Sequence, residues 1–455
     1  MTDQYLRNTT PDSISGAVSA CRGIKNSLVL INGPHGCKTY YSFGMGQTLP
    51  KASDLWGIRG ELSVKDAFAD DLLRSQYHTG SVHVPATNLR YEDFIFGTAG
   101  QLRRALDTVL QDRDYSLITV IQAPGTSLLS ESLEPLLEDV SDRTGIPYLY
   151  IESTGLSGNF DKGYDDAVVK LLDRFARKAP AVKRTGARPS VNLFGLHDYQ
   201  RYLEGDLEEI TRLLDLCGID VNLAICADCR LEDIRDLYAA DANVLLTAER
   251  CGSTRDHLRK NSPIPVIDVG WMPVGPDLTE RFVKQVSGAL GTDCGPAQKY
   301  IEKTRAKIFY HIAKRTGGRG LPKDVRYAAE GEASMLYAFA DYLTGYLGIV
   351  PEALHVLFDG TDTGGEEPLC TLLKEAGCEK ALKSDISKVK DVILLGTANT
   401  IAHVLSYSGN VFGIETMCPS SGYIDVLPKT CLGCTGSLFL LEQILNGMRL
   451  LRAWE

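Results

Sequence analysis

Residues 28–37 read LVLINGPHGC, a short apolar run that passes directly into a glycine-rich turn closed by a cysteine. The run 28–32 has the length and apolar character of a strand buried in a parallel sheet. Gly33 and Gly36 let the backbone of the turn approach a ligand closely, and a Cys37 thiolate at a helix start gains from the positive end of the helix dipole. These residue types fit a ligand-binding turn and a buried structural cysteine equally well.

The rest of the chain repeats this alternation of short apolar runs with longer helical patterns, which indicates βαβ units and parallel sheets flanked by helices. The expected strands are 28–32, 117–122, 148–152, 191–195, 221–225, 243–247, 265–269, 326–330, 355–359, 392–396 and 411–415. The expected helices are 101–111, 128–143, 165–178, 199–217, 231–239, 296–315 and 437–452. Ligands of open parallel sheets bind beyond the carboxyl ends of the strands, so the chemistry is expected in the loops that follow the strands.

A chain of 455 residues is too long for one compact core, and the pattern divides it into three Rossmann-like α/β lobes. The basic, helix-breaking stretch 178–189 predicts a linker, and the glycine-rich stretch 316–322 predicts a second break. The expected units are a first lobe with the cysteine turn at 1–180, a second lobe at 190–295, a helical crossover at 296–322 and a third lobe with a C-terminal helix at 323–455.

Composition narrows the classes of partner. A net charge of -10 argues against nucleic acid, whose phosphate backbone requires clustered Lys and Arg. No apolar run approaches the roughly 18 residues of a membrane span, and residues 1–10 lack the layout of a signal peptide, so a cytoplasmic location without a membrane partner is expected. Twelve cysteines in a reducing compartment leave metal, redox or core roles.

Two cysteine pairs have the CxxC spacing, which lets two thiolates hold one metal ion or form a redox pair. The first pair is Cys226 and Cys229, and the second is Cys431 and Cys434. Their separation in the sequence gives no sign that the pairs meet, and small residues packed in a loop are the alternative interpretation. The sequence contains no GxxxxGK[ST] motif, so any ATP hydrolysis must take place on a partner.

Four segments resemble, in order, the nitrogenase component 1 family and its tetrapyrrole-reducing relatives. They are the turn that ends at Cys37, YEDFIFG at 91–97, TGLSGNF at 154–160 continued by GYD at 163–165, and VNLFG at 191–195. In that family the cysteine of the turn binds an iron-sulfur cluster, of the 4Fe-4S or P-cluster type, at the interface of two subunits. The resemblance therefore implies that Cys37 is a metal ligand and that Gly33, His35 and Gly36 form the cluster-binding turn.

The chain departs from the family's ligand set at several positions. Asp12 stands where the family usually has a first cysteine, so it is a candidate ligand, and the alternative is a cap of the helix that begins near Ser13. Ala123 occupies the turn where a third cysteine is expected. Cys21 is a candidate substitute, and its place in an apolar helical stretch makes a core position the alternative.

Family members with a larger active-site metallocluster anchor it through a cysteine in the second lobe, and a loop near the C-terminus contacts it. Spacing puts the second-lobe position close to Ala248, so Cys251, about one turn later, is either a displaced ligand or a core thiol at a helix start. Cys431 and Cys434 lie in the terminal loop and are the candidate ligands there. A larger iron-sulfur metallocluster is therefore an additional cofactor that the resemblance allows.

The resemblance implies a subunit of an iron-sulfur oxidoreductase. Electrons from a homodimeric ATP-dependent Fe-S reductase pass through the interfacial cluster to a substrate or metallocluster site, and the partner is a homologous component 1 subunit in a heterodimer or heterotetramer. The alternatives are a scaffold for metallocluster assembly and a structural pseudo-subunit that docks the reductase. The lack of a clear second-lobe cysteine and of a histidine in the terminal loop argues against a dinitrogen-reducing α-type subunit and favours a β-like subunit or a member of an uncharacterised nitrogenase-like branch. The substrate does not follow from the fold.

Overall fold

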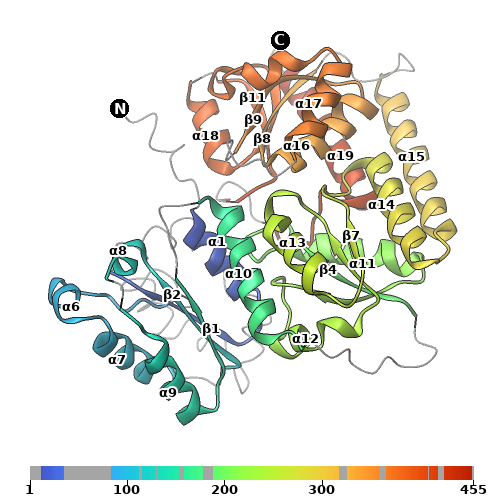
Figure 1. The fold of residues 1–455 in the computed structure, drawn as a ribbon. Coiled ribbons are helices and arrows are strands. Elements are labelled where there is room, and N and C mark those ends of the chain that lie inside the picture. The colour runs from blue at the N-terminus through green and yellow to red at the C-terminus, as the bar shows by residue number, and fades with distance from the viewer. Residues whose placement is uncertain are drawn as a thin grey trace.

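The computed structural model describes residues 12–34, 84–111, 115–129, 131–152, 158–177, 188–316, 325–357, 365–407, 409–418 and 425–452. In this part of the chain three parallel sheets flanked by helices form three lobes (Figure 1). The first lobe lies at the lower left of Figure 1, the second at the lower right and the third above them. The expected α/β class is confirmed. None of the described helices has both the length and the apolar character needed to cross a membrane.

The first sheet has the strand order β1-β2-β3. Its strands are β1 (Ser27–Asn32), β2 (Leu117–Gln122) and β3 (Tyr148–Ile151). Its helices are α1 (Ser13–Arg22), α6 (Tyr91–Phe96), α7 (Ala99–Val109), α8 (Pro124–Ser127), α9 (Glu134–Thr144) and α10 (Phe160–Phe175). Helices α7 and α9 cover one face of the sheet, and α1 and α10 cover the other. Burial on both faces explains why these strands are almost entirely apolar.

The second sheet has the strand order β5-β4-β6-β7. Its strands are β4 (Ser190–Phe194), β5 (Asp220–Ala224), β6 (Ala242–Leu245) and β7 (Val266–Asp268). Its helices are α11 (Leu203–Leu216), α12 (Leu231–Arg235), η1 (Leu237–Ala239), η2 (Glu249–Cys251), α13 (Gly252–Asn261) and α14 (Gly275–Leu290). The long helix α15 (Gly295–Thr316) then leads toward the third lobe.

The third sheet has the strand order β11-β10-β8-β9. Its strands are β8 (Arg326–Gly331), β9 (Val350–Val356), β10 (Val392–Gly396) and β11 (Val411–Glu415). Its helical elements are α16 (Ala333–Ala340), η3 (Asp341–Tyr346), α17 (Glu366–Glu375), η4 (Glu379–Lys383), η5 (Ile386–Lys388), α18 (Ala398–Tyr407) and α19 (Gly433–Arg452).

Several expected elements are shifted by a few residues in the structure, and two of the shifts have a clear cause in proline. The strand expected at 355–359 is β9, which lies earlier and contains Pro351. Because β9 is an edge strand, a proline without an N–H group is tolerated there. The helix expected at 128–143 begins only at Glu134, because Pro135 occupies the first turn of α9, where proline favours a helix start.

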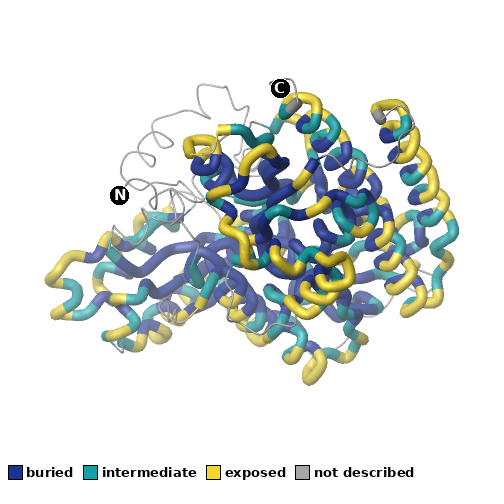
Figure 2. The backbone as a smooth tube through the Cα atoms, turned by 90° about the horizontal axis from the view of Figure 1, so that it is seen from above, coloured by how far each residue is buried: buried dark blue, intermediate teal, exposed yellow. Residues whose placement is uncertain are grey.

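The three lobes share their hydrophobic cores. One cluster of buried side chains runs from α1 and α10 of the first lobe to β5 and the residues around α12 of the second. A second cluster joins the second sheet to the third through α14, α15 and α19. Figure 2 shows buried segments continuing from one lobe into the next. Packing therefore continues from one sheet to the next, and the unit boundaries expected from the sequence stay a prediction.

Candidate functional site

The carboxyl ends of the second and third sheets meet at a junction that α10 of the first lobe also reaches. Strand order reverses between β4 and β6 in the second sheet and between β8 and β10 in the third. Ligands of open α/β sheets bind at such switch points, beyond the strand ends. Polar residues from all three lobes converge there, and we call this group the junction cluster; its members are Asp161, Glu249, Arg250, Glu332 and Ser334.

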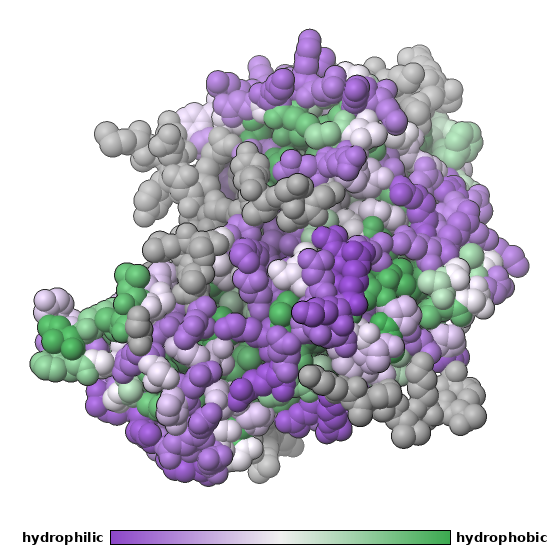
Figure 3. Space-filling view, viewed as in Figure 1, coloured by the Kyte–Doolittle hydropathy of each residue, from purple (hydrophilic) through white to green (hydrophobic). Residues whose placement is uncertain are grey.

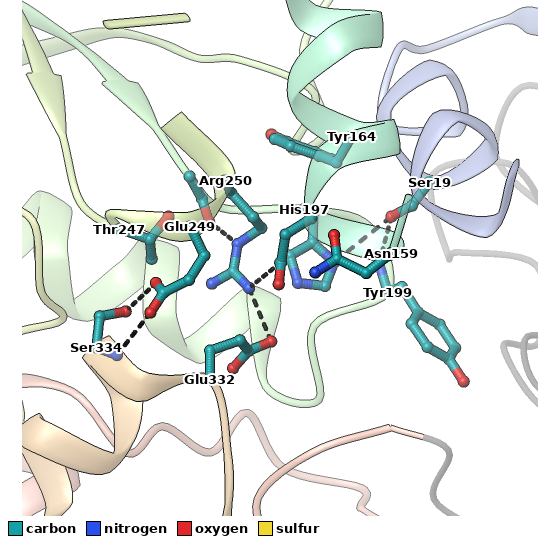
Figure 4. A network of polar contacts seen from close by, with 12 residues as sticks. Ser19, Asn159, Tyr164, His197, Tyr199, Thr247, Glu249, Arg250, Glu332 and Ser334 are labelled. Carbon is teal, nitrogen blue, oxygen red and sulfur yellow. Dashed lines mark hydrogen bonds and ion pairs between the residues drawn. The ribbon is translucent and has the colours of Figure 1, made fainter. Parts of the chain in front are cut away.

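Arg250 lies at the centre of the junction cluster (Figure 4). Its Nε donates to the carbonyl oxygen of Gly195 at 2.9 Å, and its Nη1 lies 3.2 Å from Asp161 Oδ1 and 3.0 Å from Glu332 Oε1. The arginine is only 5% exposed. Asp161 comes from α10, Arg250 from η2 and Glu332 from the loop between β8 and α16, so one guanidinium joins the three lobes.

Glu249, beside the central arginine, forms a second link between lobes. Its Oε1 accepts a hydrogen bond from the backbone N–H of Ser334 at 2.8 Å, and its Oε2 accepts one from the Ser334 hydroxyl at 2.5 Å. The junction thus holds three carboxyl groups around one guanidinium. Burial raises the pKa of Asp161 and of Glu249 above their usual range, because water no longer stabilises the charged form. The raised pKa values mean that further negative charge in the junction cluster is energetically unfavourable.

His197 lies between the junction cluster and α1 (Figure 4). Its Nδ1 is 3.4 Å from the Ser19 hydroxyl oxygen, which also accepts the backbone N–H of Tyr199 at 3.2 Å. Burial lowers the pKa of His197 well below its usual value, so the ring is neutral at physiological pH. Tyr164 packs against it, with ring centroids 5.9 Å apart, and donates its hydroxyl to the carbonyl of Leu196.

Cys251 ends η2 next to the central arginine and is buried in the apolar cluster shared by the first two lobes. The sulfur lies 3.8 Å from the Thr247 hydroxyl, and a Cβ placed on Gly195 would come within 3.3 Å of it. Burial raises the pKa of the Cys251 thiol to about 12. Ala248, at the position expected for a cluster cysteine, is buried and offers no ligand atom.

The first CxxC pair and Cys21 are packed in the core shared by the first two lobes. Cys21, Cys226 and Cys229 are all buried in one apolar cluster. The backbone around Gly23 pairs with this loop, since Cys229 N–H donates to the Gly23 carbonyl at 3.0 Å. Burial raises the pKa of Cys21 to about 12. Cys21 therefore occupies a core position, and a ligand role for it stays a prediction.

The second CxxC pair belongs to a different core, between the second and third lobes. Cys431 and Cys434 are both buried at the start of α19. Glu209 of α11 fastens this start, because its Oε1 accepts the N–H of Cys434 at 2.8 Å and its Oε2 accepts the Thr435 hydroxyl at 2.7 Å. The two pairs are not brought together. Within the described ranges no three His, Cys, Asp or Glu side chains are placed to hold a metal ion.

Asp206, one turn before Glu209, should make the stability of the protein depend measurably on pH. Its carboxyl accepts the Thr430 hydroxyl at 2.6 Å, and burial raises its pKa from 3.8 to about 7. A raised carboxyl pKa favours folding at low pH, and this contribution is lost as the pH rises from about 4 to about 7. We expect Asp206→Asn to gain stability relative to the wild type over that range, by up to about 1.4 kcal/mol per pH unit.

Thermal melts of Asp206→Asn and the wild type, run in steps from about pH 5 to about pH 8, measure this difference. Asp142→Asn is the matched control, because Asp142 is an exposed helix residue. A difference in stability that stays constant across the series would contradict a raised pKa at Asp206.

Asp12 caps the first helix. Its Oδ1 accepts the backbone N–H and the hydroxyl of Ser15, both at 3.0 Å. This is the capping role that the sequence offered as an alternative to metal binding, and the ligand role stays a prediction. Cys37, His35 and Gly36 lie outside the described residues.

Gly33, the first residue of the cysteine turn, is held at the carboxyl edge of the first sheet. Its N–H donates to the Thr87 hydroxyl at 2.9 Å, and its carbonyl accepts the N–H of Leu89 at 3.2 Å. The preceding residue, Asn32, is tied to α7 through Thr98, and its carbonyl accepts the Thr126 hydroxyl of α8. Gly33 is therefore held between the end of β1 and the starts of α7 and α8.

An apolar patch lies on the surface of the same lobe. Four large side chains on α6 and next to α8 are 59–85% exposed, namely Tyr91, Ile95, Phe96 and Leu128. Figure 3 shows a green group at the left tip of the molecule, over α6. Apolar groups that gather on a surface mark interaction sites more often than scattered ones do. We call these four residues the tip patch.

Sequence reasoning missed the junction cluster. Asp161 falls in the segment that resembles the family, and Glu249 and Arg250 directly precede the candidate ligand Cys251, but none of the three is singled out by local pattern. The available signal was the pair Glu249 and Arg250, which follows a predicted buried strand, at the edge of the sheet where ligands bind. The partners of Arg250 lie 89 and 82 residues away, so their contact could not be derived from the sequence around it.

The chain has the architecture of a three-lobe α/β protein: each lobe contains a parallel sheet, and polar residues from the three lobes meet at one junction. The family model described as nitrogenase component 1 type oxidoreductase matches residues 13–448. The chain belongs to this family, as its motifs led us to expect. The solved structure of nitrogenase Cp1 at pH 6.5 has the same fold, with a TM-score of 0.72 and 16% identity, covering 97% of this chain and 92% of that chain.

Two curated relatives show the range of roles in the family. The nitrogenase iron-molybdenum cofactor biosynthesis protein NifE of Clostridium pasteurianum is 24% identical over 65% of this chain, and the match spans 60% of that relative's length. A light-independent protochlorophyllide reductase subunit of Synechococcus sp. (strain CC9902) is 34% identical over 46% of this chain and 37% of its own length. The names of these relatives include both a biosynthetic protein and a reductase subunit.

Proposed function

We propose that this chain is a subunit of a nitrogenase-like oxidoreductase that shares an iron-sulfur cluster with a homologous component 1 subunit and receives electrons from a homodimeric ATP-dependent Fe-S reductase. The observation that carries the proposal is the position of Gly33, which starts the Cys37 turn at a sheet edge beside the exposed tip patch. A cysteine that binds a cluster shared with another chain has to lie at the surface of its lobe, where the second chain can reach the cluster. Such a cluster supplies one-electron transfer when bound.

The described residues of this chain do not supply a full set of ligands for an interfacial cluster. Ala123 has no ligand atom, and the Asp12 carboxyl already accepts two hydrogen bonds from Ser15. This chain therefore contributes Cys37, and most ligands come from the homologous subunit. Such asymmetry favours a heteromer over a symmetric homodimer.

Replacing Cys37 with serine tests the proposal. The chain is produced anaerobically together with the homologous subunit, and iron, sulfide and the paramagnetic resonance of the purified complex are measured. We expect Cys37→Ser to lose or alter the cluster signal, because a hydroxyl is a poor ligand for iron. Cys378→Ser, at a partly exposed thiol of the third lobe, is the control. Unchanged iron content and signal in Cys37→Ser would leave the proposal without support.

The tip patch is proposed to dock the reductase. Its few exposed apolar residues suit the small, transient interfaces of electron-transfer partners better than the large interfaces of permanent subunits. It also lies on the lobe whose edge starts the Cys37 turn, so a protein docked there is near the proposed cluster.

Phe96→Asp tests this docking. Phe96 is 85% exposed, so the change should leave the fold intact while placing a charge in the apolar contact. We expect reduction of the complex by the reductase to slow at least tenfold, with the two component 1 subunits still associated. Phe309→Asp, at a residue 74% exposed on α15, is the matched control. Dissociation of the two component 1 subunits in Phe96→Asp would instead assign the patch to the homologous subunit.

The second candidate is a scaffold on which a metallocluster is assembled, and the likeness to NifE favours it. A scaffold binds iron without turnover and releases the loaded cluster to an acceptor protein. Incubating the iron-loaded complex with an apo-acceptor and following iron transfer separates the two functions. A reductase subunit keeps its iron through repeated cycles of reduction.

A further inference from the structure

We infer that the three-lobe junction of this chain is occupied by its own arginine and acids, so that the chain houses no metallocluster there and the substrate site of the complex lies on the homologous partner. The inference rests on the proposed function, because it assigns the sites of that heteromer to its two chains. It concerns the junction cluster around Arg250, defined above by its contacts to Asp161 and Glu332.

The first step is the space at the strand ends. The guanidinium of Arg250 lies beyond the reversal between β4 and β6, where a ligand of the second sheet would bind. It contacts the Gly195 carbonyl at the end of β4 and carboxylates from the other two lobes. Figure 4 shows Arg250 and Glu332 pointing toward one another where the ribbons of the lobes meet. A large ligand could enter only if these ion pairs separated.

The second step is charge. Iron-sulfur clusters held by thiolates and sulfides are electron-rich and are stabilised by hydrogen-bond donors to their sulfurs. The junction offers Asp161, Glu249 and Glu332 against the one guanidinium of Arg250, and all four side chains take part in the contacts already described. Whichever of these acids is ionised would present like charge to a cluster in a site that has little water to screen it, and burial already raises the pKa of Asp161 and of Glu249.

The third step is the set of available thiols. A metal is bound by the thiolate form of cysteine. Cys251 is the described thiol nearest in sequence to the junction arginine, and its sulfur lies near Thr247 and the backbone of Gly195, in the apolar cluster shared by the first two lobes. Cys431 and Cys434 are sealed in the core between the second and third lobes. Their enclosure matches the absence, within the described ranges, of any three-ligand metal site.

The test compares variants of two cysteines in the complex prepared anaerobically with the homologous subunit. Cys251→Ser and Cys251→Ala are measured beside Cys37→Ser for iron, sulfide and paramagnetic resonance. We expect both Cys251 variants to keep the full iron content and every signal, while Cys37→Ser loses the signal of the interfacial cluster. Circular dichroism melts first establish that each variant is folded, and the alanine variant serves if a hydroxyl in this apolar site lowers the melting temperature.

The outcomes separate the two proposals. Loss of an iron set in both Cys251 variants, with the interfacial signal retained, would overturn the inference and leave the proposed function standing. Full iron and unchanged signals in Cys37→Ser would instead remove the proposed function. A third measurement needs no cysteine variant: Arg250→Met opens the junction, and its iron content is expected to equal that of the wild type. Because loss of Arg250 is itself expected to destabilise the protein, iron is counted only in complex that circular dichroism shows to be folded, and a loss of iron there would overturn the inference.

Discussion

Replacing Arg250 with alanine lowers the free energy of unfolding by about 3–5 kcal/mol, the largest effect that we expect from a single change in this chain. Arg250 is 5% exposed and is the ion-pair partner of Asp161 and Glu332. Its removal leaves two carboxyl groups buried without a counter-charge. Because burial raises the pKa of Asp161 to about 8, the part of the destabilisation that comes from Asp161 is expected to grow as the pH rises through about 8, where this carboxyl would ionise without its partner.

Urea denaturation at several pH values measures the effect of Arg250→Ala. The matched control is Arg143→Ala, because Arg143 also lies close to two carboxylates but is about half exposed, at 49%. Water screens that surface group, so its loss should cost at most about 1 kcal/mol. Adding Glu332→Gln and Asp161→Asn to Arg250→Met should restore part of the stability, since neither former partner of Arg250 can then carry a charge. Equal effects of the two arginine changes would mean that the junction cluster does not hold the lobes together.

Replacing Gly163 with alanine has the second-largest expected effect. The reason is that α1 and α10, which cover one face of the first sheet, touch through their backbones. A Cβ on Gly163 of α10 would lie 1.8 Å from the Ser13 carbonyl oxygen of α1. A Cβ on Gly16 of α1 would lie 1.9 Å from the Phe160 carbonyl oxygen of α10. Backbone atoms cannot rotate away as a side chain can, so the helices must separate. We expect a loss of about 3 kcal/mol or more, at the upper end for overpacked cores.

Gly100→Ala is the control for this change. Gly100 also lies in a helix of the first lobe, but the nearest contact of an added Cβ is the end of the Arg104 side chain, at 3.9 Å. Alanine there should stabilise the protein by about 0.5–1 kcal/mol, because glycine is a poor helix former. Opposite signs for Gly163→Ala and Gly100→Ala in thermal melts are the expected result. Equal signs would mean that α1 and α10 are not in backbone contact.

The pattern of elements could be predicted where local sequence is sufficient. β2 was expected at its observed bounds, and β1 within one residue, because continuous apolar runs bounded by glycine or polar residues identify buried strands. The prediction was wrong for β9, because Pro351 interrupts the strand pattern and proline is found mainly in edge strands such as this one. It was also wrong at the start of α9, where the apolar pattern continued past the true N-terminus of the helix.

The sites divide in the same way. The succession of strands along the chain and the resemblance to the component 1 family could be derived from residues that are neighbours in the chain, since apolar periodicity acts locally, and the turn that ends at Cys37 stays a prediction. The environment of Cys251 and the ion pairs of Arg250 depended on tertiary structure. Those ion pairs join residues 82 and 89 positions apart, and an ion pair forms only when packing of the lobes brings its charges together and excludes water.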